Sequence, residues 1–299
     1  MDRPKIALGS WAFAFGPFAA SPWPFAEVIR YAADAGYDGV EINGFRPHPH
    51  PDDYDTADKC AELVKEIEGL GLGISGYAAD FSTVPPALVD TQQYVDVVRK
   101  SLAFCTNCGI STLRVDTASP PDELAPDEYD ERFARLTRTW RAAAVEAAKD
   151  GITIVWEFEP GFWLNKPSEV MATVEAVGHQ SFKLLFDTSH AYMGAVIGAR
   201  QTGEKQLLDG GVVEYGRMLS DHIGHLHLID SDGTLHNDET STHTAFGEGY
   251  INFDEVLAAL KPLISGMPWW CVDFCFNPET EAKGKNAVAF LKGLMDKVL

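Results

Sequence analysis

The sequence predicts an α/β protein that folds as a single (β/α)8 TIM barrel over residues 1–299. Short apolar segments alternate eight times with longer segments in which apolar residues recur at helical spacing, which is the element order of this barrel. A doubly wound nucleotide-binding sheet would carry a glycine fingerprint after its first strand, and none follows residues 5–13. No linker, repeat or low-complexity segment divides the sequence.

Each expected strand is followed by its expected helix. The strands are predicted at residues 5–13, 39–44, 72–80, 111–119, 152–159, 182–190, 223–230 and 269–276. The helices are predicted at residues 24–36, 56–71, 91–109, 127–151, 166–178, 210–222, 252–264 and 280–299. Several of them end in the glycine that helix ends favour. The longest gap, residues 231–250, follows the seventh strand. Loops of this length usually have a function, so we expect it to cover the active-site face and bring His243 or Glu248 there.

The composition argues against several classes of protein. The net charge is −20, whereas nucleic acids and anionic membranes bind basic faces, so we expect neither as a partner. No uninterrupted apolar run approaches about 18 residues, so no membrane span is predicted. The sequence starts without an apolar signal segment and contains five cysteines, an odd number. We therefore expect a cytoplasmic protein, and we interpret Cys105 and Cys108 as buried thiols rather than a zinc or redox site.

Polar residues gather where the expected strands end, which is where such barrels carry their chemistry. They are Glu41, Asn43, Arg114, Asp116, Glu157, Glu159, Asp187, His190, His225, His227, Asp230 and Asp273. Singly, each could be a helix cap or a core residue. Together, three carboxylates and one imidazole from four neighbouring strands would be unstable in one pocket without a cation. The pattern predicts one divalent metal ion, with Mn²⁺ as the first expectation and Mg²⁺, Co²⁺ and Zn²⁺ as alternatives.

Two glutamates of the fifth strand, Glu157 and Glu159, are two residues apart and therefore share one face. Glu159 directly precedes Pro160, so we place it at the mouth of the barrel as a metal ligand. Glu157 would lie roughly 6–7 Å lower. By the same logic His227 is the ligand of its strand, and we expect Glu157 and His225 to hydrogen-bond the ligands from behind. The alternative for Glu157 is a buried acid paired with a nearby arginine or histidine.

Aromatic residues at the expected strand ends and loops predict a sugar substrate, because aromatic faces pack on the C–H faces of sugar rings. They are Trp11, Phe13, Phe15, Phe45, Phe162 and Trp163. Packing in the core is the alternative. No cluster of basic residues or glycine-rich helix start offers a phosphate site, which favours a free or glycosidic sugar. His48 lies in a proline-spaced loop at residues 44–54 and could reach the substrate, with a surface turn as the equal alternative. The residues expected around the substrate are Trp11, Phe13, Glu41, His48, Arg114, Glu157, Trp163, His225 and His243.

Five short motifs carry a resemblance that covers nearly the whole chain. They are YAADAGYDGVEI at residues 31–42, WEFEP at 156–160, FDTSH at 186–190, HLHLID at 225–230 and FGEGYINFDEVLAAL at 246–260. In this order the sequence resembles the xylose isomerase-like TIM barrel superfamily, in particular its sugar phosphate isomerase/epimerase branch. The resemblance implies one divalent ion held by Glu159, Asp187, His227 and Asp273, with His190 on the substrate side and Glu159, His190 and Asp273 as the catalytic residues. It also implies a homodimer or tetramer.

The sequence departs from this branch at two points. The eighth-strand ligand of the epimerases is usually glutamate, and here it is Asp273. The arginine that often follows the seventh-strand histidine in ketose 3-epimerases is absent, because Gly233 stands there. Nucleic-acid-repair members bind three metals through many more histidines, and nine scattered histidines with a charge of −20 do not fit them.

The expected chemistry starts with a carboxylate that removes the proton next to a ketone, with an enediolate as the intermediate. Return of the proton gives a sugar isomerase or epimerase, and loss of a β-substituent gives a lyase. The second hypothesis is the α-subunit of a C-glycoside deglycosidase, which acts on 3-keto sugars joined by carbon to an aromatic ring and pairs with a small β-subunit. The third is a metal-free barrel that only binds a partner. Because Asp273 is shorter than glutamate, we expect weak C3 epimerisation of simple ketohexoses and activity on a bulkier keto-sugar.

Overall fold

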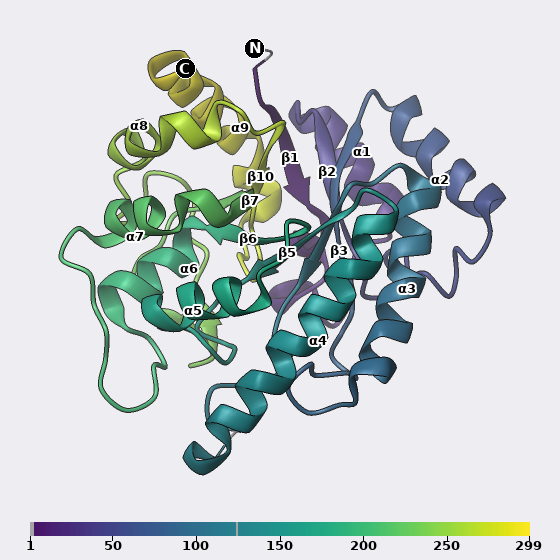
Figure 1. Cartoon of the computed structure of the whole chain (residues 1–299). Helices are drawn as coiled ribbons and strands as arrows, with labels where there is room; N and C mark the ends of the chain where they lie inside the picture. Colours follow the sequence, from purple (N-terminus) through teal and green to yellow (C-terminus); the bar gives the residue numbers. More distant parts are fainter. Residues whose placement is uncertain (1–2, 124) are drawn as a thin grey trace.

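A closed barrel of eight parallel strands forms the centre of the molecule (Figure 1). The computed structural model describes residues 3–123 and 125–299. The barrel strands are β1 (Lys5–Gly9), β2 (Gly39–Asn43), β3 (Gly73–Ala78), β4 (Thr112–Val115), β5 (Thr153–Glu157), β6 (Phe182–Asp187), β7 (Ile223–Leu228) and β10 (Trp269–Val272). They follow one another around the barrel in chain order, and β10 closes it against β1. The predicted (β/α)8 architecture is confirmed.

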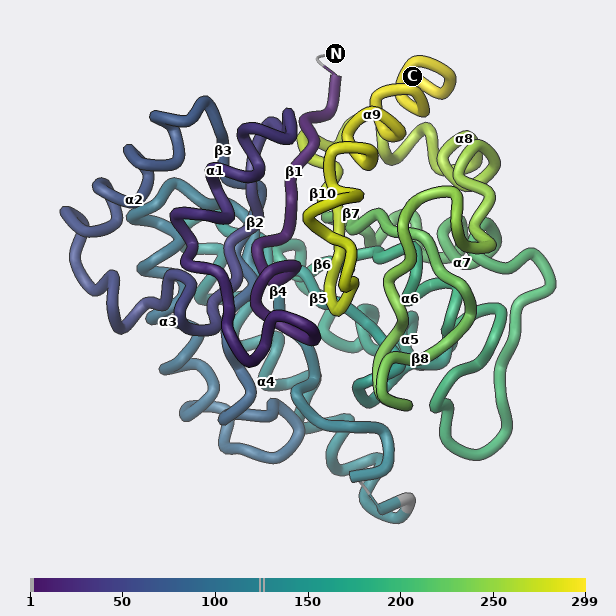
Figure 2. The backbone as a smooth tube through the Cα atoms, turned by 180° about the vertical axis from the view of Figure 1, so that it is seen from behind, coloured from purple at the N-terminus to yellow at the C-terminus, as the bar shows by residue number. Residues whose placement is uncertain are grey.

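Helices surround the barrel, as the view from behind in Figure 2 also shows. They are α1 (Phe25–Ala35), α2 (Ala57–Gly69), α3 (Thr91–Cys108), α4 (Tyr129–Lys149), α5 (Pro167–Val177), α6 (Thr188–Tyr192), α7 (Gly211–Leu219), α8 (Phe253–Ile264) and α9 (Thr280–Val298). Glycines and side-chain caps determine where several of these helices begin or end. Gly36 ends α1 with a left-handed φ of 86°, and the side chain of Asp90 caps α3 by accepting a hydrogen bond from Gln92 N–H.

Three departures from the expected elements shape the active-site end. The first strand stops at Gly9, because residues Ser10–Phe13 turn into the short 3₁₀ helix η1. β6 runs directly into α6 and the π-helical turn η4 (Met193–Ile197), so the helix α7 comes later in its unit. The long segment after β7 contains a small antiparallel hairpin of β8 (Leu235–His236) and β9 (Thr240–Ser241).

One carboxylate holds the base of this long segment. Asp230 Oδ1 accepts hydrogen bonds from the backbone N–H groups of Ser231 and Ile251, at 2.9 and 3.0 Å. Its Oδ2 accepts from the N–H groups of Gly247 and Gly249, both at 3.0 Å. Glycine is required at 249, because an added Cβ would lie 2.4 Å from Asp230 Oδ1. The hairpin is therefore fixed relative to the barrel.

Large aromatic side chains fill the space between the strands and the helices. Trp140 of α4 packs on Trp156 of β5 and on Phe182 of β6, with ring centroids 5.1 and 5.3 Å apart, and all three are buried. Among the described residues the five cysteines are free thiols. The same residues include no helix long and apolar enough to cross a membrane.

Candidate active site

A cavity of about 460 Å³ lies at the carboxyl ends of the strands. Its polar lining is Asn43, Arg114, Asp116, Glu157, Glu159, His190, Arg200, Glu239, Thr240, His243 and Asp273. Four partly exposed phenylalanines, Phe15, Phe45, Phe162 and Phe276, also line it and mark its mouth. Buried charged side chains therefore line the inner part of the cavity, and the more exposed lining combines these phenylalanines with Arg200 and Glu239.

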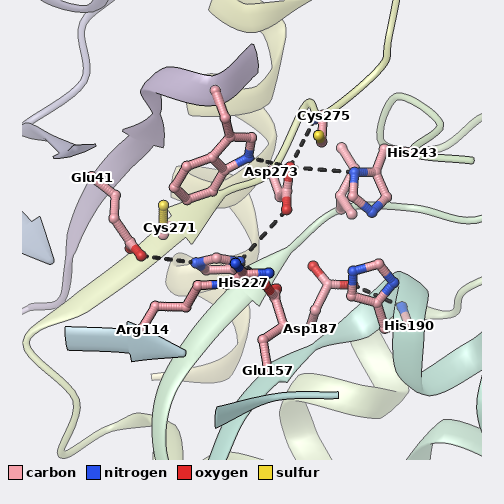
Figure 3. Close-up of polar contacts among 12 residues, drawn as sticks. Glu41, Arg114, Glu157, Asp187, His190, His227, His243, Cys271, Asp273 and Cys275 are labelled. Carbon is pink, nitrogen blue, oxygen red and sulfur yellow. Dashed lines mark hydrogen bonds and ion pairs between the residues drawn. The ribbon is translucent and has the colours of Figure 1, made fainter. Parts of the chain in front are cut away.

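Four acidic and imidazole side chains converge beside this cavity (Figure 3). Each of Glu157, Asp187, His227 and Asp273 offers one ligand atom within 4.8 Å of the others, and all four are buried. They come from β5, β6, β7 and the residue after β10. Register explains part of the convergence, since Asp187 and His227 are direct partners on neighbouring strands. We call this set the acid–histidine cluster.

The cluster contains Glu157, whereas the sequence analysis expected Glu159 as the ligand of this strand. β5 ends at Glu157, and Glu159 lies beyond it in the loop. From there the Glu159 carboxylate accepts a hydrogen bond from Thr240 Oγ1 and lies 3.5 Å from an Arg114 nitrogen and 3.8 Å from His190 Nε2. Glu159 therefore lines the cavity above the cluster. Two glutamates on one face do not show which of them is the last residue of the strand.

The cluster fits a divalent cation on three observations. Oδ2 of Asp187 is buried and has no hydrogen-bond partner in the part of the chain that the structure describes. Burial, with the carboxylates of Asp273 and Glu157, raises the pKa of Asp187 to about 7 despite His243. Burial opposes a charge on His227, yet Glu157 and Glu41 raise its pKa well above the ordinary value, so the cluster attracts positive charge. Three carboxylates and one imidazole suit a hard or borderline divalent ion.

His227 is held from behind by Glu41. Its Nδ1 faces Glu157 Oε1 at 2.9 Å, and its Nε2 lies 3.3 Å from Glu41 Oε1. The other oxygen of Glu41 lies 2.6 Å from His225 Nε2. Burial alone would raise the pKa of Glu41, but the charges of His225 and His227 hold it well below its ordinary range. Glu41 and His225, expected at the substrate, therefore lie beneath the cavity and orient a cluster residue.

Arg114 joins the carboxylates of the cavity wall. Its Nε donates to Glu157 Oε2 at 2.7 Å and one terminal nitrogen donates to Asp116 Oδ2 at 2.6 Å. Burial acts against ionisation of Glu157, but Arg114 and His227 lower its pKa to about 2. Glu157 is thus a buried acid paired with an arginine, which was the alternative expected for it, and it is also a member of the cluster.

Asp273 accepts two hydrogen bonds and lies close to two imidazoles. Its Oδ1 accepts from Trp11 Nε1–H at 2.6 Å and from Cys275 N–H at 2.7 Å, and it lies 3.3 Å from His243 Nδ1. Its Oδ2 lies 3.6 Å from His227 Nδ1. Burial is outweighed by the charges of His243 and His227, which hold the pKa of Asp273 well below its usual value. Such a carboxylate is a good ligand and a weak base.

Two histidines complete the inner wall. His190 Nδ1 lies 2.8 Å from Ser241 Oγ, and its backbone N–H donates to Asp187 Oδ1. Burial lowers the pKa of His190 to about 3, so its ring is neutral. Burial acts the same way on His243, but Asp273 raises its pKa to about 9. The two rings lie 5.1 Å apart between centroids.

Comparison with known proteins agrees with this architecture. The family model described as "Xylose isomerase-like TIM barrel" matches residues 29–292. The chain belongs to this family. Fructoselysine 3-epimerase of Escherichia coli O157:H7 is 23% identical over 252 residues, which cover 78% of this chain and 80% of that protein. Inosose dehydratase of Erwinia tasmaniensis is 24% identical over 294 residues, 91% of this chain and 90% of that protein. The crystal structure of a D-tagatose 3-epimerase-like protein superposes with a TM-score of 0.72 at 21% identity, covering 99% of this chain and 100% of that one.

Three side chains expected at the substrate lie elsewhere in this xylose isomerase-like barrel. Phe13 stacks on Trp23 with ring centroids 4.3 Å apart, because the η1 turn directs it into the core. His48 is buried, with Nδ1 3.1 Å from Ser10 Oγ and Nε2 3.0 Å from the carbonyl of Trp23. Trp163 packs edge-on against Tyr129 and is also buried.

Sequence reasoning did not single out several residues that line the cavity of this family member. They are Pro120, Gly161, Arg200, Glu239, Thr240, Cys275 and Phe276. Asp116 also lines the cavity and was noted only as a strand-end residue. The length of residues 231–250 was the available signal for Glu239 and Thr240, which lie in that segment with His243. Arg200 and Phe276 carry no local signal, since their position depends on where separate loops meet. Glu248 lies outside the lining and pairs with Lys283 at 2.6 Å.

Proposed function

We propose that this protein is a divalent-metal-dependent enzyme that acts on a keto-sugar or a sugar derivative by removing a proton next to its carbonyl group. The observation that carries the proposal is the acid–histidine cluster, with its unpartnered Asp187 oxygen, beside a cavity walled by aromatic side chains. The relatives support a carbohydrate-like substrate, since one is named an epimerase of fructoselysine and another a dehydratase of inosose.

Glu157, Asp187, His227 and Asp273 would hold the ion, with Mn²⁺ expected first and Mg²⁺, Co²⁺ or Zn²⁺ as alternatives. When bound, the ion stabilises negative charge on a carbonyl oxygen and a neighbouring hydroxyl oxygen of the substrate. His227 can present Nδ1 to the ion because Glu41 occupies its other nitrogen.

Glu159 is the carboxylate best placed to move a proton. Glu157 is paired with Arg114 and His227, and Asp273 accepts from Trp11 and Cys275. Glu159 accepts from Thr240 but faces the cavity beside His190. Burial, opposed by Arg114 and reinforced by Glu157, raises the pKa of Glu159 to about 8. A carboxylate of this kind can accept a proton from carbon and return it near neutral pH. The neutral ring of His190 is placed to accept a hydrogen bond from a sugar hydroxyl.

The fate of the proton decides the reaction. If Glu159 returns it to the neighbouring carbon, an aldose and a ketose interconvert. If the substituent on the β-carbon leaves with its electron pair instead, a double bond forms and the leaving group takes up a proton. Epimerisation is the third outcome, in which a second acid delivers a proton to the opposite face of the substrate carbon. It is disfavoured because the hydrogen bonds that Asp273 accepts make it a poor proton donor and acceptor.

The test is to strip the purified protein with a chelator, reload it with Mn²⁺ and assay it on D-fructose, D-tagatose and keto-sugars with bulkier substituents. We expect chelation to abolish activity, reloading to restore it, and the bulkier substrates to react faster. C3 epimerisation of D-fructose or D-tagatose at a typical enzymatic rate, ~10 per second, would show that this assignment of Asp273 is wrong. Failure to bind any divalent ion would favour the metal-free binding barrel.

A second function is favoured by the four phenylalanines at the mouth. An aromatic group attached to the sugar would lie among Phe15, Phe45, Phe162 and Phe276, which suits the α-subunit of a C-glycoside deglycosidase. This enzyme would expel the aromatic group from a 3-keto sugar and would work with a small β-subunit. Co-purification of a small partner, and cleavage of a 3-keto aryl C-glycoside only in its presence, would distinguish it from a stand-alone isomerase.

A further inference from the structure

The indole of Trp11 touches two members of the acid–histidine cluster. Its Nε1 lies 2.6 Å from Asp273 Oδ1, the shortest of the three donor contacts to that oxygen. Its ring lies 5.1 Å from the ring of His227 between centroids, at an interplanar angle of 37°. Trp11 is only 6% exposed and also lines the cavity. One side chain therefore packs on the imidazole and binds the carboxylate of the same site.

The backbone is adapted to this position of the ring. Trp11 follows β1 directly in the η1 turn, which folds its side chain back over Gly9. A Cβ added at Gly9 would lie 2.2 Å from Cζ2 and 2.3 Å from Cε2 of the indole. Any residue except glycine at position 9 would push the indole away from Asp273. Gly9 and Trp11 thus act as one unit.

Three rings surround the carboxylate of Asp273. Trp11 Nε1 and His243 Nδ1 lie 2.6 and 3.3 Å from one oxygen, and His227 Nδ1 lies 3.6 Å from the other. A glutamate would carry its carboxylate about 1.3 Å farther along the side chain. If the side chain kept its present direction, the extra methylene would bring the carboxylate against one of these rings. Of the three, Trp11 makes the closest contact and is not itself a member of the cluster.

We propose that Trp11 is a positioning residue that fixes the length of the acid at position 273, and so determines which reaction the site can perform. With Trp11 present, residue 273 remains an aspartate that accepts two hydrogen bonds and serves only as a ligand. A smaller ring at position 11 would make room for glutamate, which could reach the substrate face opposite Glu159. Removal of the indole and lengthening of the acid are therefore coupled. The consequence for the reaction and the Mn²⁺ readout of the coupling rest on the proposed function, whereas the contact between Trp11 and Asp273 does not.

The experiment is a double-mutant cycle of Trp11→Phe and Asp273→Glu, read out by calorimetric Mn²⁺ affinity. Asp273→Glu alone should weaken binding by at least about 10-fold, and by less than about 3-fold in the Trp11→Phe background. The matched control replaces Trp11→Phe by Trp23→Phe, because Trp23 lies in the same β1–α1 connection but packs on Phe13. It should not relieve the effect of Asp273→Glu. If Asp273→Glu lowers the Mn²⁺ affinity equally in the presence and absence of Trp11, the proposal is overturned.

Indole N–H resonances of ¹⁵N-tryptophan protein provide a second test that does not depend on the folding of the double variant. The signal absent from Trp11→Phe should lie downfield in the wild type and move upfield in Asp273→Asn. An unchanged position would overturn the proposal. In the activity arm, the double variant should gain C3 epimerisation of D-tagatose that neither single variant shows. Coupled Mn²⁺ affinities without activity on any keto-sugar would support the role of Trp11 and reject the proposed function instead.

Discussion

Nδ1 of His227 lies 2.9 Å from Oε1 of Glu157, across the barrel interior from β7 to β5. This contact places Glu157 in the acid–histidine cluster and leaves Glu159 in the cavity above it. The two glutamates share one face of one segment, yet they have different partners and oppositely shifted pKa values: about 2 for Glu157 and about 8 for Glu159. Glu157 is therefore the proposed metal ligand, and Glu159 is the proposed base.

Substitution of the two glutamates should therefore have different effects. Glu157→Gln is expected to weaken Mn²⁺ binding by at least about 100-fold, because a ligand is lost. Glu159→Gln, the matched control, should change affinity by less than about 10-fold while it lowers kcat by about 10²–10⁴. Calorimetry and steady-state kinetics measure the two quantities. The reverse pattern would restore Glu159 as the ligand.

Glu41 should influence the metal without touching it. Glu41→Gln removes the negative charge that faces His227 Nε2 and is expected to weaken Mn²⁺ binding by about 10–100-fold. Ser75→Ala is the control, because Ser75 Oγ makes only a long contact of 3.4 Å to Glu41 Oε2 and its loss keeps the charge. A Glu41→Gln protein that binds Mn²⁺ as the wild type does would show that His227 needs no support from behind.

The mouth of the cavity should discriminate between substrates. Phe45→Ala and Phe162→Ala are expected to raise KM by about 10-fold or more for a keto-sugar that carries an aromatic substituent, since each removes buried apolar contact. The same variants should leave KM for the unsubstituted keto-sugar within about 3-fold. Equal increases for both substrates would indicate that the phenylalanines bind the sugar itself.

His48 should make the stability of the protein depend on pH. Burial lowers its pKa from 6.5 to about 4, so the native state disfavours the charged ring that the unfolded state acquires. Its contribution is complete above pH 6.5 and is lost as the pH falls toward 4, by up to about 3 kcal/mol. Urea unfolding between pH 7 and 4.5 should therefore show a steeper loss for the wild type than for His48→Gln. Parallel curves would contradict this prediction.

The sequence predicted the barrel and the position of most of the cluster for a physical reason. Asp187, His227 and Asp273 are each the inward-facing polar residue nearest to the end of a strand, and periodicity locates strand ends to within a few residues. The sequence could not decide which of Glu157 and Glu159 joins the cluster, because two glutamates on one face leave the last strand residue undetermined. Contacts between separate loops, such as that of Thr240 with Glu159, are not encoded in any local pattern.

The short turn η1 explains why Phe13 and His48 lie away from the cavity. A strand that continued to residue 13 would have placed Trp11 and Phe13 on one face, both toward the substrate. The turn instead sends Phe13 to Trp23, while Trp11 lines the cavity and donates to Asp273. His48 contacts Ser10 of the same turn, so one unpredicted bend set the surroundings of two expected substrate residues.

Asp230 closes the segment after β7 at its base, so the rest of that segment does not have to hold the two ends together. Both ends of the loop close on one carboxylate, through Ser231 on one side and Gly247, Gly249 and Ile251 on the other. These hydrogen bonds at the base offset the entropy cost of closing the loop. The tip of the hairpin is therefore not needed to hold the barrel together. Insertions, deletions or grafts from relatives within residues 232–239 can therefore remodel the entrance, while Thr240, Ser241 and His243 keep their contacts with Glu159, His190 and Asp273.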